Sequence, residues 1–526
     1  MFTRPRIDAL QDSLGTDLIQ FLPELVVAGG VVVLLFARLV RALDRTHLGG
    51  VALAVLAVAL FAALAGRPPD VGTARQGSIF TGMLVADGFA AYVRVVVLAA
   101  ALVTVLLTRV TGLPDAEDSA DFHALLLGGT LGMLLMASAN HLLMAFIAVE
   151  MASLPGYVLA GFLKGKRTGG EAALKYVVFG AGASGVMLYG ISLVAGTFGT
   201  GYLPDVAAAA AVRLAGQGGL DPVLLAGVAL TLVGLGFKLA AVPFHFWCPD
   251  VFAGAAAEVA AFLSVASKAA AVGLTARLLY SFHAAAPDPW LVPRTLGVGV
   301  GVVGAVTVTF GNLAAFAQTD LKRLLAYSTI AHAGYMLLGL AALTLGAASG
   351  VLYYLAAYLL MNLGAFAVVA VVRNATGAED VTAFRGLAWR APVAAVAMAV
   401  FLFSLLGFPP LAGFAGKFQV FAAIYDAARS APGWLGSALY AFLAVGAVNT
   451  AVSAVYYLKV VRAMVLEDAP EEGRGVAVPG PAANLLLAAL AAGVVALGVV
   501  WNPLTGAADQ AATGISRPFS SGVATR

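Results

Sequence analysis

Long uninterrupted apolar runs, separated by short polar stretches, dominate the hydrophobic pattern of this chain. Most runs are about 20 residues long, the length of an α-helix that crosses the hydrocarbon core of a bilayer. They lack the alternation of apolar and polar positions that a barrel strand requires. The pattern therefore predicts about fourteen membrane-spanning helices. These spans lie near 18–40, 47–66, 83–108, 121–138, 141–163, 171–195, 222–245, 258–280, 292–316, 321–343, 347–373, 392–428, 435–466 and 482–502.

The composition supports this class of protein. Hydrophobic residues make up 61% of the 526 positions and charged residues 11%, whereas a soluble domain carries about 25% charged residues. Only helices and closed barrels satisfy their backbone inside lipid, so we expect an all-α polytopic protein of the lipid bilayer. The net charge of +3 is too small to indicate nucleic-acid binding. Cys248 is the only cysteine, so the chain has no disulfide framework and no thiolate metal or iron–sulfur site.

Lysine and arginine are more frequent in the loops that would face the cytoplasm if the N-terminus lay outside. Loops rich in lysine and arginine stay on the cytoplasmic side when a membrane protein is inserted. We therefore predict a multi-pass protein of the cell (inner or plasma) membrane. Because the number of spans is even, both termini are predicted to lie outside the cytoplasm. Four lysines at loop ends are interpreted as interfacial anchors: Lys164, Lys166, Lys322 and Lys459.

Prolines interrupt two of the predicted spans. Pro243 falls in the span 222–245, and Pro409 and Pro410 fall in the run 392–428, which is too long for one straight crossing. Proline removes a backbone donor and clashes with the preceding turn, so helices 7 and 12 are expected to be interrupted. Paired interrupted spans in corresponding positions indicate inverted repeats around a transport path. The predicted units are N-terminal helices 1–3 (1–120), a first five-helix inverted repeat (121–280), a second one (281–470), and a last helix with its tail (471–526).

Ionisable side chains within the spans are the candidate functional residues: Glu150, Lys175, Lys238, Lys268 and Lys417. An ionisable group at bilayer depth costs roughly 2.5 kcal/mol or more and by default marks a functional site. Unpaired, the carboxylate of Glu150 would take up a proton, whereas a lysine partner would keep it ionised. Lys175 and Lys238 are the candidate partners, and a purely structural ion pair is the alternative.

A row of buried lysines beside one carboxylate can carry protons. Burial disfavours the charged form of a lysine and a nearby carboxylate favours it, so such a lysine can take up and release protons, as arginine cannot. His245 and His332 are candidate relays in this row, because an imidazole exchanges protons near neutral pH. The alternative for each is a hydrogen-bonded structural histidine. Asp87 and Arg94 share one helix face and are interpreted as a structural pair.

Two of the lysines are assigned separate roles. Lys268 lies near the middle of its span, in the block that links the first repeat to the second, and is predicted to be the central relay. Lys417 follows Pro410 by less than about three helical turns and belongs to the second repeat, so it is predicted to be the exit-side proton site. The alternative for Lys417 is neutralisation of the helix break, because a cation stabilises the C-terminal end of a half-helix.

Four motifs resemble those of one family. The stretch PFHFWCPDVFAGAAAEVAAFLSVASKAA is similar to the run PFHxWxPDVYxGAPxxVxAFLSxxSKxA of the proton-pumping membrane subunits of NADH–quinone oxidoreductase, respiratory complex I. VEMASLPGYVLAGF, QTDLKRLLAYSTIAHAGYMLLG and GFPPLAGFAGKF agree with the same family. The resemblance covers roughly 80–470 and is greatest to the N-type subunits. One departure is AGAAAEVAA in place of the usual Gly-Ala-Pro-Thr-Pro, which places Glu258 at the start of helix 8.

The resemblance implies a fold and a function. It implies fourteen helices, two inverted five-helix repeats and interrupted helices 7 and 12. It implies a glutamate on helix 5 and lysines on helices 7 and 8, where Glu150, Lys238 and Lys268 stand, and the N-type lysine of helix 12 at Lys417. The chain would translocate protons as part of an NADH:quinone oxidoreductase and perform no redox chemistry itself.

The expected partners also follow from the resemblance. NADH, FMN, iron–sulfur clusters and quinone are expected in partner subunits and no cofactor in this chain, with M-type and K-type membrane subunits as its neighbours. The alternative is a subunit of a cation/proton antiporter or of a membrane-bound hydrogenase with the same fold. A purely structural scaffold would not explain the ionisable groups within the spans.

Overall fold

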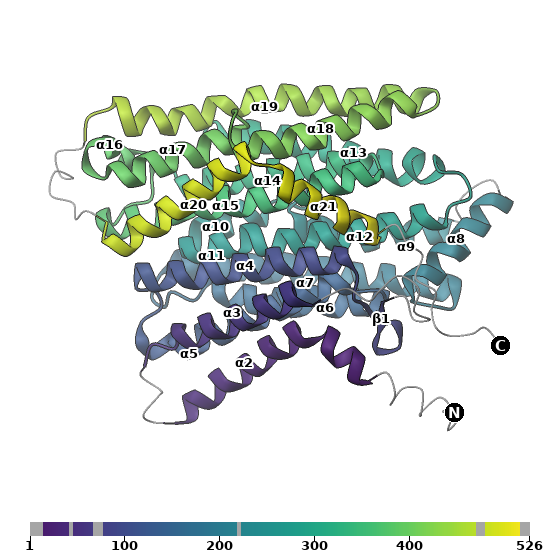
Figure 1. The fold of residues 1–526 in the computed structure, drawn as a ribbon, viewed down its shortest axis with the longest axis horizontal. Helices are drawn as coiled ribbons and strands as arrows, with labels where there is room; N and C mark the ends of the chain where they lie inside the picture. The colour runs from purple at the N-terminus through teal and green to yellow at the C-terminus, as the bar shows by residue number, and fades with distance from the viewer. Residues whose placement is uncertain (1–13, 41–45, 67–76, 218–221, 470–478, 516–526) are drawn as a thin grey trace.

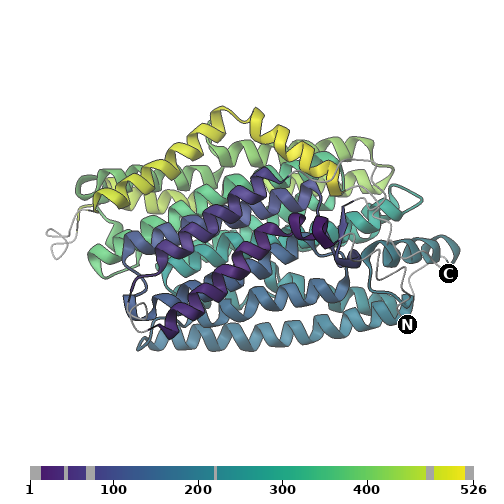
Figure 2. The ribbon, with the colours of Figure 1, turned by 60° about the horizontal axis from the view of Figure 1, so that its bottom comes forward.

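The chain folds into a bundle of helices that lie side by side along one common direction (Figures 1 and 2). The computed structural model describes residues 14–40, 46–66, 77–217, 222–469 and 479–515. A short antiparallel hairpin, β1 (Ser78–Ile79) with β2 (Leu84–Val85), lies at one end of the bundle. Helices of the first half are α2 (Leu22–Leu39), α3 (Gly49–Ala65), α4 (Gly88–Thr111), α5 (Ser119–Ser138), α6 (Leu142–Ala160), α7 (Arg167–Phe198), α8 (Leu203–Gln217), α9 (Pro222–Leu239), α10 (Trp247–Gly254), α11 (Ala257–Phe262) and α12 (Lys268–Ala285).

The second half continues the same bundle. Its helices are α13 (Val298–Ala315), α14 (Leu321–Ala341), α15 (Leu345–Thr376), α16 (Leu387–Arg390), α17 (Pro392–Leu406), α18 (Ala412–Ser430), α19 (Trp434–Leu466), α20 (Pro481–Val499) and α21 (Asn502–Ile515). Side chains that accept from the first turn begin α4, α14 and α15, namely Asp87, Asp320 and Thr344. Helices α14 and α15 are almost entirely buried, so they form the centre of the bundle.

Twelve helices of the described chain are long and apolar enough to cross a membrane. Two shorter apolar helices, α3 and α17, occupy the second and twelfth predicted crossings. Each of the crossings predicted from the hydrophobic pattern therefore has a helix, and the all-α polytopic class is confirmed. The span Ala257–Ala285 consists of α11, a π-helical turn η3 (Leu263–Ser267) and α12, and its residues 257–280 are all buried.

The two proline-rich interruptions are confirmed. Helix α9 ends at Leu239 and α10 begins at Trp247; α17 ends at Leu406 and α18 begins at Ala412. At the second interruption a Cβ on Gly413 would lie only 1.8 Å from the carbonyl oxygen of Ser404, so the two half-helices approach as closely as they do only because residue 413 is glycine. The division of the bundle into two inverted repeats remains a prediction.

The predicted tail after residue 502 is partly wrong. Residues 502–515 form α21, which packs on α4 and α15, and the last crossing therefore consists of two helices, α20 and α21. They are the bent yellow segment in Figure 1. Hydropathy missed α21 because its exposed face is polar or small, and only Ala508, Ala511, Ala512 and Ile515 are buried. The remainder of the predicted tail, 516–526, lies outside the described residues.

Two buried ion pairs hold the N-terminal helices to the bundle. The predicted Asp87–Arg94 pair is wrong, because each residue has another partner. Arg94 Nε lies 2.6 Å from Glu24 Oε1 on α2. Arg277 on α12 donates to both carboxylate oxygens of Asp87, at 2.7 and 3.0 Å, and also to the carbonyl oxygen of Ala137 at the end of α5. Arg277 therefore ties three helices together.

Replacing this arginine should destabilise the fold. Arg277→Ala would leave the buried carboxylate of Asp87 without its partner, which costs about 3–5 kcal/mol. Arg294→Ala is the matched control, because its pair with Asp288 is largely exposed and such pairs contribute about 0–1 kcal/mol. Thermal denaturation of the purified proteins, with assembly judged by native gel, measures the difference. Equal losses of thermal stability in the two variants would contradict the conclusion that the Arg277–Asp87 pair stabilises the fold.

Candidate functional site

Lys238 lies beside Glu150 and contacts α6 through Ser153, without an ion pair to the carboxylate itself. Lys238 Nζ donates to Ser153 Oγ at 2.8 Å, and Ser153 lies one turn after Glu150 on α6. The ammonium and the carboxylate are within electrostatic reach of each other. Among the described residues, none hydrogen-bonds the buried Oε1 of Glu150. The lysine is thus held beside the carboxylate by a hydroxyl, and the carboxylate keeps an open oxygen.

Lys268 binds the broken end of α9. It is the first residue after the π-helical turn η3, and its Nζ donates to the carbonyl oxygens of Leu239 and Thr329, each at 3.0 Å. Leu239 is the last residue of α9, where carbonyl groups lose their helical partners. Thr329 lies on α14. Lys268 therefore connects the first interruption with the central helix, at the residue that follows Lys238 in the chain.

Lys417 makes the same kind of contact at the second interruption. Its Nζ donates to the carbonyl oxygens of Leu405 and Leu406, the last two residues of α17, each at 3.0 Å. The ammonium also lies 4.4 Å from the centre of the Tyr335 ring, a cation–π contact. This geometry is the one that neutralisation of the helix break requires. Both interruptions therefore present the end of a half-helix to a buried lysine.

His332 lies between these two lysines. Its Nδ1 is 2.5 Å from the hydroxyl of Tyr354 and its Nε2 is 3.1 Å from that of Tyr457. Both Lys268 and Lys417 are within electrostatic reach of the ring. Helices α14, α15 and α19 each supply one member of this buried cluster. The imidazole therefore occupies the centre of the row that runs from Glu150 to Lys417.

His245 packs against aromatic rings at the first interruption, and its role as a relay remains a prediction. It belongs to the segment between α9 and α10, and its ring packs on those of Phe246 and Phe310, with centroids 4.4 and 4.3 Å away. Its buried Nδ1 has no hydrogen-bond partner in the part of the chain that the structure describes. The contacts of His245 are thus those of a packed aromatic residue at the break.

Lys175 does not meet Glu150, so this proposed partnership is wrong. Its Nζ lies 2.7 Å from Asp250 on α10 and 2.7 Å from Glu171 on its own helix, and its side chain is 37% exposed. Arg323 Nη1 lies 3.1 Å from the other oxygen of Asp250. Asp250 thus fastens α10 to both α7 and α14, and Lys175 is a member of this network.

Sequence reasoning named Lys322 and Glu258 but did not predict the partners of these two buried charges. Lys322, interpreted as an interfacial anchor, is only 3% exposed; its Nζ lies 2.7 Å from Glu379 and donates to the carbonyl oxygen of Ala255, directly after α10. Glu258 is fully buried and accepts two hydrogen bonds from Arg373 on α15. Lys322 was expected to be exposed because it stands at a loop end. Its partner Glu379 is almost 60 residues away, and the local sequence does not indicate such a contact.

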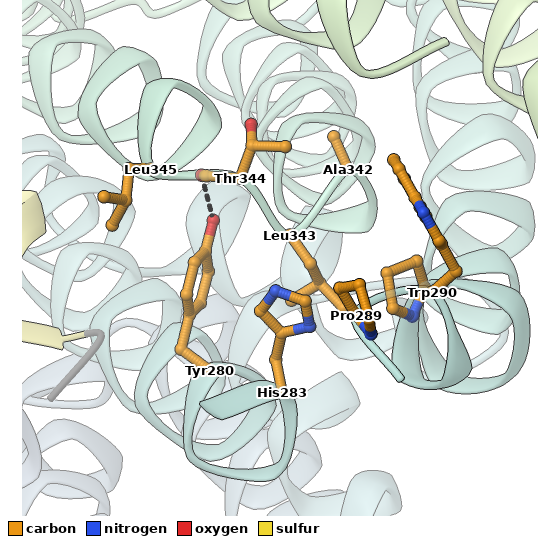
Figure 3. A pocket seen from close by; sticks show the side chains of 9 residues that line it. Tyr280, His283, Pro289, Trp290, Ala342, Leu343, Thr344 and Leu345 are labelled. Atoms are coloured by element: carbon orange, nitrogen blue, oxygen red, sulfur yellow. Dashed lines mark hydrogen bonds between the residues drawn. The ribbon is translucent and has the colours of Figure 1, made fainter. Parts of the chain in front are cut away.

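A cavity of about 250 Å³ lies at one end of α12 and is separate from the row (Figure 3). Its lining is mostly apolar and includes Tyr280, His283, Trp290 and Leu343, none of which belongs to the row. The hydroxyl of Tyr280 donates to the carbonyl oxygen of Thr344 at 2.6 Å. In the described part of the chain, no group of three or more His, Cys, Asp and Glu side chains could hold a metal ion.

Proteins of known family resemble this chain over most of its length. Residues 139–442 match the family model described as NADH:quinone oxidoreductase/Mrp antiporter, TM. The chain is 41% identical over 498 residues to NADH-quinone oxidoreductase subunit N of Anaeromyxobacter sp. (strain Fw109-5), covering 92% of this chain and 94% of that protein. It is 40% identical over 451 residues to the subunit N of Rhodospirillum rubrum, covering 86% and 88%.

Solved structures share the fold. A chain of respiratory complex I from Thermus thermophilus with bound Aureothin matches with a TM-score of 0.72 and 33% identity, over 92% of this chain and 98% of that one. A chain of the Mrp complex from Dietzia sp. DQ12-45-1b matches with a TM-score of 0.79 and 23% identity, over 96% and 98%. The second likeness concerns the fold alone.

The contacts of Lys175 predict that its positive charge supports the fold and that release of its proton plays no part in transport. Lys175→Arg should keep the pairs with Asp250 and Glu171, because a guanidinium binds carboxylates at least as well as an ammonium does. The rate of proton uptake should therefore stay within about twofold of wild type. Lys175→Ala, which removes both pairs, is the companion variant. Proton uptake by inverted vesicles measures both. Loss of uptake in the arginine variant would place Lys175 in the proton row instead.

Proposed function

This chain belongs to the family of NADH-quinone oxidoreductase subunit N, and on that premise we propose that its row of buried charges carries protons through the membrane domain of the complex. It is a membrane subunit of respiratory complex I, and it works in contact with other membrane subunits. Its contribution to the NADH:quinone oxidoreductase reaction is proton translocation. We infer no antiporter function from the similarity to the Mrp complex, because that similarity concerns the fold alone.

The observation that carries the proposal is the continuity of the row across both interruptions. Glu150 faces Lys238, whose neighbour Leu239 accepts from Lys268. Lys268 and Lys417 both act electrostatically on His332. The row thus brings together ionisable side chains from α6, α9, α12, α14 and α18, and these side chains are the groups that take up and release the proton.

The proton itself can be followed along the row. A proton taken up at Glu150 neutralises the carboxylate and removes the charge that favours ammonium at Lys238. Lys238 then releases its proton towards Lys268, and His332 passes it on to Lys417. Lysine suits these positions because, unlike arginine, it can lose its proton when buried.

The direction of transport rests on the charge of the loops. With the N-terminus outside, the row begins on the cytoplasmic side and ends at Lys417, which opens outward. We assign NADH, FMN, iron–sulfur clusters and quinone to partner subunits, with M-type and K-type membrane subunits as direct neighbours. The complex then resides in the cell (inner or plasma) membrane with both termini of this chain outside the cytoplasm.

Removing the first charges of the row tests the function. Glu150→Ala or Lys238→Ala should lower NADH-driven proton pumping and quinone reduction at least about tenfold, because the proton loses its first two carriers. Assembly should be largely intact, since neither residue closes an ion pair with the other. Glu117→Ala and Lys166→Ala, at exposed positions, are the controls. Full pumping by both variants in inverted vesicles, followed with a pH-sensitive dye, would reject the proposal.

A second substitution separates proton transfer from fixed charge at Lys268. Arginine can still donate to the carbonyl oxygens of Leu239 and Thr329, but it holds its proton at any accessible pH. Lys268→Arg should therefore impair pumping nearly as much as Lys268→Ala. Wild-type pumping by the arginine variant would mean that the lysine only stabilises the end of α9. The Lys175→Arg variant provides the comparison, since the same exchange is expected to be harmless there.

A further inference from the structure

The junction between α20 and α21 rests against the second interruption. A Cβ on Gly498 would lie 2.1 Å from the carbonyl oxygen of Pro410, so the last turn of α20 touches the backbone between α17 and α18. The ring of Trp501, within the junction, lies 6.0 Å from that of Phe418 on α18. The last crossing is therefore broken beside the break that carries Lys417.

Polar side chains line this junction. The hydroxyl of Tyr353 on α15 donates to the carbonyl oxygen of Leu497 at 2.6 Å. Gln419, two residues after Lys417 on α18, donates through Nε2 to Thr505 Oγ1 on α21 at 3.0 Å. Apolar side chains would stabilise this junction more simply if its only role were to pack α20 and α21 on the bundle, because buried polar groups need hydrogen-bond partners to offset their desolvation.

A carboxylate lies one helical turn further along α21. Asp509 follows Thr505 by four residues on α21, so the two side chains lie on the same face of that helix, and α21 packs on α15. The buried hydroxyl of Ser349 donates to Asp509 Oδ1 at 2.5 Å. Asp509 itself is exposed.

Asp509 stands near the end of the bundle at which α4 and α15 begin. Gly88 and Phe89 at the start of α4 touch α21 at residues 510–514, directly after Asp509. In Figure 1 this part of α21 lies on the side of the hairpin β1–β2. The polar contacts of the junction and Asp509 therefore lie in sequence between the second interruption and this end of the bundle.

We propose that Asp509 is the terminal proton acceptor of the outward route, receiving the proton that leaves Lys417 and releasing it to the external face. The proposal rests on the function assigned to Lys417 above. The ammonium of Lys417 loses a proton and becomes a neutral amine; the carboxylate of Asp509 gains it and becomes a carboxylic acid. Gln419 and Thr505, hydrogen-bonded to each other, join α18 to α21 one helical turn before Asp509, and Asp509 returns to carboxylate when the proton enters the water outside.

The competing role for Asp509 is to fasten α21 through Ser349. The two roles differ in what asparagine can do, because its side-chain oxygen still accepts from the hydroxyl while it cannot take up a proton. Glutamate keeps the acid but lengthens the side chain. Ser349→Ala removes the fastening hydrogen bond and leaves the acid in place. Asp426→Asn, an exposed acid on α18, is the matched control.

The experiment measures proton pumping by the whole complex in inverted vesicles for these four variants and for Lys417→Ala. We expect pumping to fall about tenfold in Asp509→Asn and to stay near wild type in Asp509→Glu, Ser349→Ala and Asp426→Asn. Wild-type pumping in Asp509→Asn together with loss in Lys417→Ala would overturn the role of Asp509 and leave the row intact. Wild-type pumping in both would overturn the row itself.

Assembly on a native gel decides the remaining outcome. If Asp509→Asn fails to assemble while Ser349→Ala assembles, the carboxylate supports the fold and the proposal is wrong. The outward direction is tested with Asp509→Cys, since the native Cys248 is fully buried. An impermeant thiol reagent should label this subunit when it is added outside intact spheroplasts. Labelling only in inverted vesicles would contradict the external position.

Discussion

Backbone carbonyl groups that lose their helical partner inside a bilayer must find another donor, because no water reaches them there. Both interruptions create such carbonyls. The free carbonyl of Leu239 accepts from Lys268, and those of Leu405 and Leu406 accept from Lys417. At the first interruption the indole of Trp247 also donates to the carbonyl of Phe237. The broken helices are thus tolerable only because side chains from neighbouring elements complete them.

This dependence ties protonation to backbone structure. An ammonium group forms charge-assisted hydrogen bonds, which are roughly twice as strong as neutral ones. When Lys268 or Lys417 is neutral, the end of its half-helix is held less firmly; when it is charged, the helix end is drawn towards it. A lysine that serves as a proton carrier therefore also serves as the cap of an interrupted helix, and the two roles considered for Lys417 share one contact.

The hydrophobic pattern and the prolines were sufficient to predict the crossings and both interruptions, because helix length and helix breaking are local properties. Glu150, Lys238, Lys268 and Lys417 were found because a charge within an apolar run is conspicuous. Partners were not predictable in the same way. Arg277 lies 190 positions from Asp87, and no periodicity reports such a contact. The helix α21 was missed because a short amphipathic segment of small residues has the composition of a tail.

The π-helical turn before Lys268 sets the length of the chain at this point. A π turn accommodates one residue more than an α-helix of equal rise, and each residue of an α-helix turns by about 100°. Removing one residue from Leu263–Ser267 would convert this turn into regular α-helix, with α11 and Lys268 kept close to their present orientation. Ser264, which accepts from Asn362 within the turn, would leave its partner. The wider turn thus serves to place the side chains of Leu263–Ser267, and its loss would be felt at Ser264 and Asn362 and not at the two ends of the span.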